Sequence, residues 1–233
     1  MPIGLRSDVL RFDIDKSGSL DVLTNRLVNV PVALPESHGA IFLAAADEFA
    51  ERGYDGAGVD RIAARAKVNK AMLYYHFGSK RQLYLEILRQ MFTAVGARAR
   101  DIANGPGDAP TKADAWVAAI VDEAAQRPWF PSMMLRELAS GAPRFDPDTF
   151  ALMNAVFGAV RDIILQGQRE GSFRQVDPLL VHLTIMPAVL CFFARQRAIA
   201  ANNLSGGIAE PRALAQFVSH MQDTVRRTLR TDP

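Results

Sequence analysis

Apolar residues recur at three- and four-residue intervals along most of the chain, which is the spacing that places them on one face of an α-helix. After residue 36 this pattern predicts a succession of helices separated by short segments rich in Gly, Pro or Asn. No strand pattern of any length follows residue 36 in the sequence, so the predicted fold class is all-α. The predicted helices are one from a Ser37 cap to Gly53, Val59–Ala66, Lys70–Phe77, a long helix capped by Ser79, Thr111–Gln126, Pro128–Ser140, Asp148–Glu170, Pro178–Ala201 and Pro211–Leu229.

Residues 1–36 carry a different pattern. The stretches VLRFDI and LDVLTNRLV flank Asp15–Lys16–Ser17–Gly18, which has the composition of a hairpin turn. The segment from Asp13 to Thr24 also matches part of a calcium-binding loop, but Thr24 stands where the bidentate Glu belongs. We therefore predict a hairpin or a flexible arm here in preference to a calcium site.

The two short predicted helices and the turn between them form a helix-turn-helix pattern. Val68 is the apolar plug of the turn, and Asn69 is a good N-cap for the second helix. Leu73 and Phe77, four residues apart, point inward in that helix. A core helix would not leave two tyrosines, a histidine and a lysine on its open face, whereas a helix that lies in a DNA major groove would. The side chains left to face outward are those of Lys70, Ala71, Met72, Tyr74, Tyr75 and His76.

These residues, with what precedes them, resemble the TetR family of bacterial transcriptional regulators. The matching pattern runs from Ile41 to about Phe92 and includes IFLAAADEFAERGYDG, IAARA and LYYHFGSKRQLYLEIL. Arg169–Pro178 and the later helices match more loosely. The resemblance implies a helix-turn-helix DNA-binding domain of three helices in residues 37–92. It also implies a helical ligand-binding and dimerisation domain in residues 93–233, with the arm 1–36 outside the family pattern.

The resemblance also implies which side chains meet DNA. In the family, the positions of Ala71 and Met72 approach base edges. The positions of Tyr74, Tyr75, His76 and Lys80 contact sugar-phosphate or thymine methyl groups. The chemistry suits these roles, because Lys70 and Lys80 offer charge to phosphates and tyrosine hydroxyls can donate to phosphate oxygens. The implied DNA-binding residues are Lys70, Ala71, Met72, Tyr74, Tyr75, His76 and Lys80.

Three positions depart from the family pattern. Ala57–Gly58 replaces the usual Thr/Ser pair before the first short helix, Lys67 replaces the glycine of the turn, and Ala71 replaces a glycine in the second short helix. If the turn needs a positive φ, Lys67 bears a strain of roughly 1–2 kcal/mol. These departures motivate an alternative function, a small-molecule-binding or interaction protein of the same fold that has lost operator binding.

A homodimer is expected on geometric grounds. The eight residues of the second short helix span about 12 Å and can read only a few base pairs. Two copies on a pseudo-palindromic double-stranded operator would supply the missing specificity. The resemblance assigns the interface to the last two helices, although their apolar residues also suit an intrachain core. The predicted interface residues are Leu183, Val189, Phe192, Phe193, Leu214, Phe217 and Met221.

Large apolar side chains in the C-terminal half could line a cavity for a small-molecule inducer, although each of them is also an ordinary core candidate. The resemblance implies an apolar or amphipathic ligand that releases a repressor from DNA. The near-absence of paired charges among these residues argues against a highly charged ligand. The predicted ligand-binding residues are Trp116, Trp129, Met133, Met134, Met153, Phe157 and Met186, with Phe130 and Phe150 beside them.

Composition narrows the setting. The formal charge of +2 is too small to indicate DNA binding by itself, so a local patch must carry it, near Arg61, Arg65, Lys67, Lys70, Lys80 and Arg81. The single cysteine, Cys191, excludes an intramolecular disulfide and fits a reducing cytoplasm, and its apolar surroundings predict a buried thiol. The apolar run Leu179–Ala194 is shorter than the roughly 20 residues of a membrane span, so we expect a buried helix and no membrane partner.

Motifs for catalysis are absent from the sequence. It contains neither a phosphate-binding P-loop nor a zinc-protease helix motif, and its four histidines are far apart. Glu137 could be a buried acid, but with Arg136 beside it we expect an ordinary solvated or paired carboxylate. We therefore predict no enzyme activity, no cofactor and no metal site.

Overall fold

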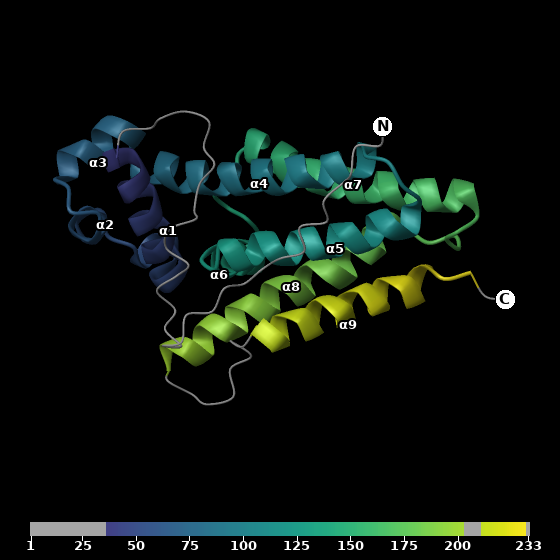
Figure 1. Ribbon diagram of the computed structural model, residues 1–233. Coiled ribbons are helices and arrows are strands. Elements are labelled where there is room, and N and C mark those ends of the chain that lie inside the picture. The colour runs from purple at the N-terminus through teal and green to yellow at the C-terminus, as the bar shows by residue number, and fades with distance from the viewer. Residues whose placement is uncertain (1–35, 203–210, 232–233) are drawn as a thin grey trace, which may run out of the picture. The chain divides into compact units, whose positions relative to one another are not determined.

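The computed structural model describes residues 36–202 and 211–231. Every regular element within these ranges is an α-helix, which confirms the all-α prediction (Figure 1). The N-terminal arm, with its expected hairpin and the Asp13–Thr24 segment, lies outside the described residues. The helices are α1 (Glu36–Gly56), α2 (Val59–Arg65), α3 (Lys70–Phe77), α4 (Lys80–Asn104), α5 (Ala109–Gln126), α6 (Phe130–Ala139), α7 (Pro147–Glu170), α8 (Pro178–Ala201) and α9 (Pro211–Leu229).

Capping residues fix most of these boundaries. The side chain of Asn69 accepts a hydrogen bond from the backbone N–H of Met72, and Ser79 accepts one from Gln82 at the start of α4. The prediction for Ser37 was wrong, because α1 begins at Glu36 and its first turn includes Ser37. Gly53 interrupts α1 with a φ of 70° and a ψ of 175°, so the expected break is present although helical turns continue to Gly56.

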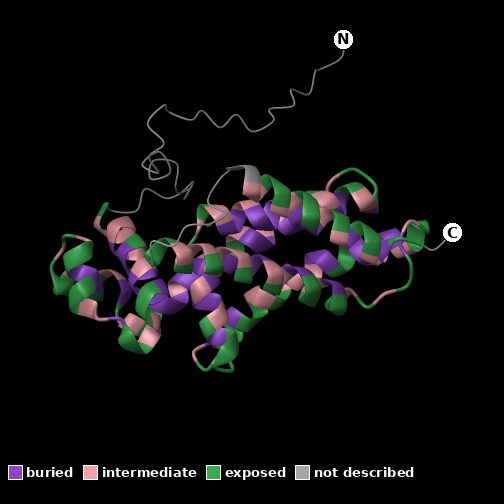
Figure 2. Cartoon of the chain, turned by 90° about the horizontal axis from the view of Figure 1, so that it is seen from below, coloured by how far each residue is buried: buried purple, intermediate pink, exposed green. Residues whose placement is uncertain are grey.

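Packing divides the buried side chains into two clusters. The first joins α1, α2, α3 and most of α4 with α6, and the second joins the end of α4 with α5, α7, α8 and α9. The division is not complete, because Val156 of α7 and Leu190 of α8 also belong to the first cluster and α6 packs against α8. Buried residues run along the inner faces of the helices, and α4 lies beside α7 over much of its length (Figures 1 and 2).

Helix α8 is less buried than the sequence predicts. Val181, Ile185 and Val189 face the core, whereas Leu180, Leu183 and Cys191 are exposed on the opposite side. The prediction of a buried thiol at Cys191 was therefore wrong, because the inward positions around it belong to its neighbours. By length and composition alone, α7 and α8 could each cross a membrane, but packed helices of soluble proteins pass the same test.

The same packing revises the predicted dimer interface. Val189 and Met221 are 1% and 4% exposed within this one chain, so they belong to its core and not to a surface open to a partner. Phe192 and Phe217 stack on each other with ring centroids 4.0 Å apart and remain partly exposed. Phe193 and Leu214 are partly buried against the second cluster, and Leu183 is 53% exposed.

Candidate DNA-binding surface and ligand cavity

The helix-turn-helix formed by α2 and α3 rests on a tightly packed base. Ile62 and Leu73 are fully buried and Phe77 is 7% exposed, which fixes both helices against α1 and α4. In the turn, the N–H of Val68 donates to the carbonyl of Ala63 at 3.0 Å. Lys67 has a φ of 55°, in the left-handed region that favours glycine, so the expected strain at this residue is present.

The outer face of α3 is more exposed at its centre than at its edges. Tyr75 is 81% exposed and Tyr74 is 44% exposed, and Ala71 is exposed beside them. The expectation that Met72 and His76 also face outward holds only in part. Met72 is half-buried against the first cluster, and the Nε2 atom of His76 lies 2.8 Å from the hydroxyl of Ser37 on α1.

Half of the six cations in the basic patch predicted around these helices are paired with acids of the same chain. Arg61 contacts Glu48 at 2.5 Å, Arg65 contacts Glu51 at 3.0 Å, and Lys70 contacts Asp60 at 2.9 Å. Of the six patch cations, the ones without an ion pair to any described acid are Lys67, Lys80 and Arg81. The patch therefore presents less free positive charge than its residue count suggests.

Glu48 replaces part of the missing cap before α2. Among the described residues, the N-cap Gly58 contributes no side-chain hydrogen bond, and its N–H donates to Glu48 at 3.5 Å. Glu48 is 2% exposed. Burial alone would raise the pKa of its carboxyl, but the hydrogen bonds from Arg61 and from the Gly58 backbone outweigh burial and hold the pKa below its ordinary value.

Lys80, at the start of α4, packs on an aromatic ring. Its Nζ atom lies 4.5 Å from the centre of the Tyr54 ring, and the guanidinium of Arg144 lies 4.6 Å from the same centre. Burial, together with the nearby charge of Arg144, lowers the pKa of Lys80. The end of α1, the start of α4 and the loop between α6 and α7 therefore meet at Tyr54.

Glu137 connects this meeting point to α6. Its carboxylate is 1% exposed and accepts hydrogen bonds from the hydroxyl of Tyr84 at 2.8 Å and from Arg144 at 3.1 Å. Burial raises the pKa of Tyr84, and the hydrogen bond from its hydroxyl to Glu137 raises the pKa further. Arg144 also contacts Asp55 at 2.5 Å. Glu137 is thus buried and not solvated, and it is paired, as the sequence allowed, although its partner is Arg144 and not Arg136.

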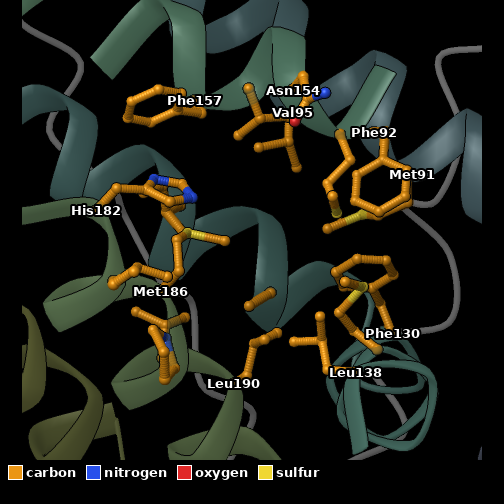
Figure 3. Close-up of a pocket in the computed structure, with 18 of the residues that line it drawn as sticks. Met91, Phe92, Val95, Phe130, Leu138, Asn154, Phe157, His182, Met186 and Leu190 are labelled. Atoms are coloured by element: carbon orange, nitrogen blue, oxygen red, sulfur yellow. The ribbon is translucent and has the colours of Figure 1, made fainter. Parts of the chain in front are cut away.

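A cavity of about 250 Å³ lies among α4, α5, α6, α7 and α8 (Figure 3). Four of the predicted ligand-binding residues, and Phe130, line it. The lining residues most exposed to solvent belong to α6, α7 and α8, so the cavity opens between these three helices. The predicted ligand-binding residues that line the cavity are Met134, Met153, Phe157 and Met186. The residues at the opening include Leu138, Asn154, Leu179 and Leu183.

The other predicted lining residues lie elsewhere. Trp116 is 2% exposed in the second cluster, and Trp129 and Met133 are 6% and 1% exposed in the first, so all three fill core volume. Side chains of α4, which the sequence analysis did not predict to bind ligand, form part of the wall instead. These missed residues are Met91, Phe92 and Val95.

His182 is another lining residue that the sequence analysis did not predict. Its ring lies 5.4 Å from that of Phe157 and 6.4 Å from that of Trp116, centre to centre. Burial lowers the pKa of His182 to about 4, so the imidazole is neutral near pH 7. A histidine within an apolar run gives no sequence signal that separates a cavity wall from a core position.

Known proteins resemble the chain in both halves. A family model described as "Bacterial regulatory proteins, tetR family" matches residues 41–87, and one described as "Tetracyclin repressor-like, C-terminal domain" matches residues 111–225. The HTH-type transcriptional repressor NicS of Pseudomonas putida is 30% identical over 193 residues, which cover 82% of this chain and 91% of that protein. The chain belongs to the TetR family. Members of this family are DNA-binding transcriptional regulators, and the α2–α3 motif lies within the matched N-terminal segment.

Other TetR-family proteins agree in sequence and in fold. The HTH-type transcriptional regulator RutR of Escherichia coli is 29% identical over 154 residues, covering 63% of this chain and 68% of RutR. The solved structure of the ketosteroid transcriptional regulator KstR2 of Mycobacterium tuberculosis matches with a TM-score of 0.68 at 22% identity, covering 88% of this chain and 98% of that one. At that identity the structural match supports the shared fold alone.

Proposed function

We propose that this chain is a cytoplasmic repressor that binds a pseudo-palindromic operator as a homodimer and is released by a small apolar or amphipathic molecule. The observation that carries the proposal is the outer face of α3, where Tyr74 and Tyr75 are exposed above a base of fully buried side chains. Exposed aromatic side chains on a rigid short helix suit insertion into a major groove. The relative NicS, which matches over most of its length, is named a transcriptional repressor.

In this proposal the centre of α3 carries sequence specificity. Ala71 and Met72 approach base edges, and Tyr74 and Tyr75 contact thymine methyl groups and phosphates. Lys70 would exchange its contact with Asp60 for a phosphate oxygen. His76 and Lys80 would add backbone contacts at the C-terminal end of α3 and the start of α4.

The exposed side of α8 is the proposed dimer surface. Leu180 is 63% exposed and Leu183 is 53% exposed, and Cys191 lies two to three turns further along the same helix. An apolar side of this length favours a partner. We keep Leu183 and the stacked pair Phe192–Phe217 in the interface and add Leu180 to it.

Ligand release would act through α4 and α6. Both helices line the cavity, α6 also packs against α1, and α4 begins directly after α3. A molecule that favours a wider cavity would move these helices and change the spacing of the two recognition helices in the dimer. In this arrangement residues 37–92 bind DNA, residues 93–233 bind the ligand and the partner subunit, and α4 belongs to both parts.

Fluorescence anisotropy of labelled DNA from upstream of the chain's own gene tests the proposal. We expect saturable binding that random competitor DNA displaces poorly, and at least a tenfold loss in Tyr75→Ala at unchanged melting temperature and dimer mass. Phe150→Ala is the matched control, because Phe150 is an exposed aromatic residue on α7, 40% exposed. We expect this control to bind as the wild type does.

Two results would contradict the proposal. Wild-type affinity in Tyr75→Ala would remove α3 as the specificity-bearing face. If the chain selects no sequence even from a randomised DNA library, the alternative holds, namely a small-molecule-binding protein of this fold that has lost operator binding.

A further inference from the structure

The cavity offers one deep polar group to a ligand. Among the described residues that line it, the polar side chains are Asn154 and His182, and none is charged. Asn154 is exposed at the opening, whereas His182 lies further in, beside Phe157 and Met186 (Figure 3). A molecule inside the cavity therefore meets apolar walls everywhere except at the edge of one imidazole ring.

His182 is short of hydrogen bonds. Its Nδ1 atom is buried and has no hydrogen-bond partner among the described residues. A neutral imidazole has one N–H donor and one lone-pair acceptor, and buried polar atoms of this kind are normally paired. A ligand oxygen that accepts from, or donates to, this ring would restore a pairing that the chain itself leaves open.

The walls exclude charge from the inner part of the cavity. A carboxylate placed there would lose its hydration without gaining a cationic partner, because no Arg or Lys lines the space. The volume of about 250 Å³ corresponds to roughly eight waters at about 30 Å³ each, which suits a molecule on the order of ten non-hydrogen atoms. The flexible side chains of Met91, Met134, Met153 and Met186 can adapt to its outline.

We infer that the cavity takes a neutral, mostly apolar small molecule with a single hydroxyl or carbonyl group that hydrogen-bonds His182. The inference rests on the proposed role of the cavity as the ligand site and narrows its ligand class. An uncharged alcohol, phenol, aldehyde or ketone of one ring fits these requirements, and a carboxylic acid of the same size does not.

Isothermal titration of the full chain with four matched probes tests this class. Toluene, benzyl alcohol, benzaldehyde and benzoate share a benzene ring with one exocyclic carbon and differ in the polar group that this carbon carries. On the wild type we expect benzyl alcohol or benzaldehyde to bind at least tenfold more tightly than benzoate. In His182→Phe we expect their affinity to fall about three- to tenfold while toluene affinity is kept, because one neutral hydrogen bond is lost and the ring volume is retained.

Controls separate the hydrogen bond from general damage. His182→Gln keeps a hydrogen-bonding amide and should retain part of the preference for the oxygenated probes over toluene. His220→Phe changes an exposed histidine on α9 and should leave all four affinities unchanged. If the melting temperature of His182→Phe falls well below that of the wild type, His182→Leu is used in its place.

Three results would overturn the inference. They are benzoate binding as tightly as benzyl alcohol, equal weakening of toluene and benzyl alcohol in His182→Phe, and no binding of any neutral probe at millimolar concentration. Operator anisotropy measured on the same samples keeps the proposed function separate. Binding of benzyl alcohol that depends on His182, in a chain that binds no operator, would uphold the ligand class and refute the repressor.

Discussion

The outer face of α3 and the cavity behind α6 differ in how the chain builds them. The face comes from eight consecutive residues between two helix caps, and its outward positions follow from local helical spacing. The cavity takes its wall from five helices and from residues that lie up to about a hundred positions apart in the sequence. A local surface depends on the chain nearby, whereas a cavity depends on how every surrounding helix is rotated about its own axis.

Two adjacent methionines give the strongest test of this difference. Met133 and Met134 are both buried and both belong to the first cluster, but of the two only Met134 also lines the cavity. We expect Met133→Ala to lower the free energy of unfolding by about 2–5 kcal/mol, since it removes a fully packed side chain. Met134→Ala should cost roughly 1–2 kcal/mol less, because part of its surface already faces open space.

Urea denaturation of both variants at one protomer concentration measures the two losses. The same samples can be titrated with benzyl alcohol. Its affinity should change in Met134→Ala and stay constant in Met133→Ala. Equal losses of stability together with equal changes in affinity would mean that the cavity wall is assigned to the wrong side of α6.

This pair also explains how much the sequence could predict. Successive helical residues are about 100° apart, so apolar composition alone cannot decide which of two neighbouring methionines faces a cavity. For the same reason Trp116 and Trp129 were predicted to line the cavity and instead fill the core. The bounds of α3, α8 and α9, the Asn69 cap and the positive φ at Lys67 depend on local signals and were predicted correctly, whereas several other helices begin or end one or two residues from the predicted positions.

Burial and pairing between helices are equally hard to predict from the sequence. Cys191 and Val189 lie two residues apart in one apolar run, yet one is exposed and the other is 1% exposed. Glu137 was expected to be solvated or paired because Arg136 is its neighbour in sequence, and it is buried and bonded to Tyr84 and Arg144. Contacts between helices that are far apart in the chain produce no periodic pattern in the sequence, so the spacing of residues cannot predict them.

A smaller effect is expected from the titration of His182. Its pKa is about 4 in the folded chain against an ordinary value of 6.5. Between these values the unfolded chain binds a proton that the folded chain does not, so stability falls as pH falls below 6.5. From pH 7 to pH 5 this loss amounts to about 2 kcal/mol.

Urea denaturation at several pH values between 7 and 5 measures the effect. The wild type should lose more stability over this range than His182→Phe, whereas His220→Phe should follow the wild type. Because other groups titrate in all three proteins, the difference between the curves isolates His182. Parallel curves for wild type and His182→Phe would show that this ring is as accessible to protons as an exposed histidine.

The smallest effect is expected in the turn of the helix-turn-helix. Lys67 has a φ of 55°, which costs a residue with a Cβ atom roughly 1–2 kcal/mol, whereas glycine adopts this conformation freely. Glycine also makes the unfolded chain more flexible, so we expect a net gain in stability of about 0.5–1 kcal/mol in Lys67→Gly. That gain corresponds to a rise of roughly 1–4 °C in melting temperature.

Lys67→Ala is the matched control, because it removes the same charge but keeps the Cβ atom. We expect no gain in stability from it, and both variants should lose the same small amount of affinity for DNA of any sequence. Since the turn is built from local residues alone, benzyl alcohol should bind both variants as it binds the wild type. An equal rise in melting temperature in the two variants would assign the effect to the lost charge, and a change in benzyl alcohol affinity would mean that the turn and the cavity are not independent.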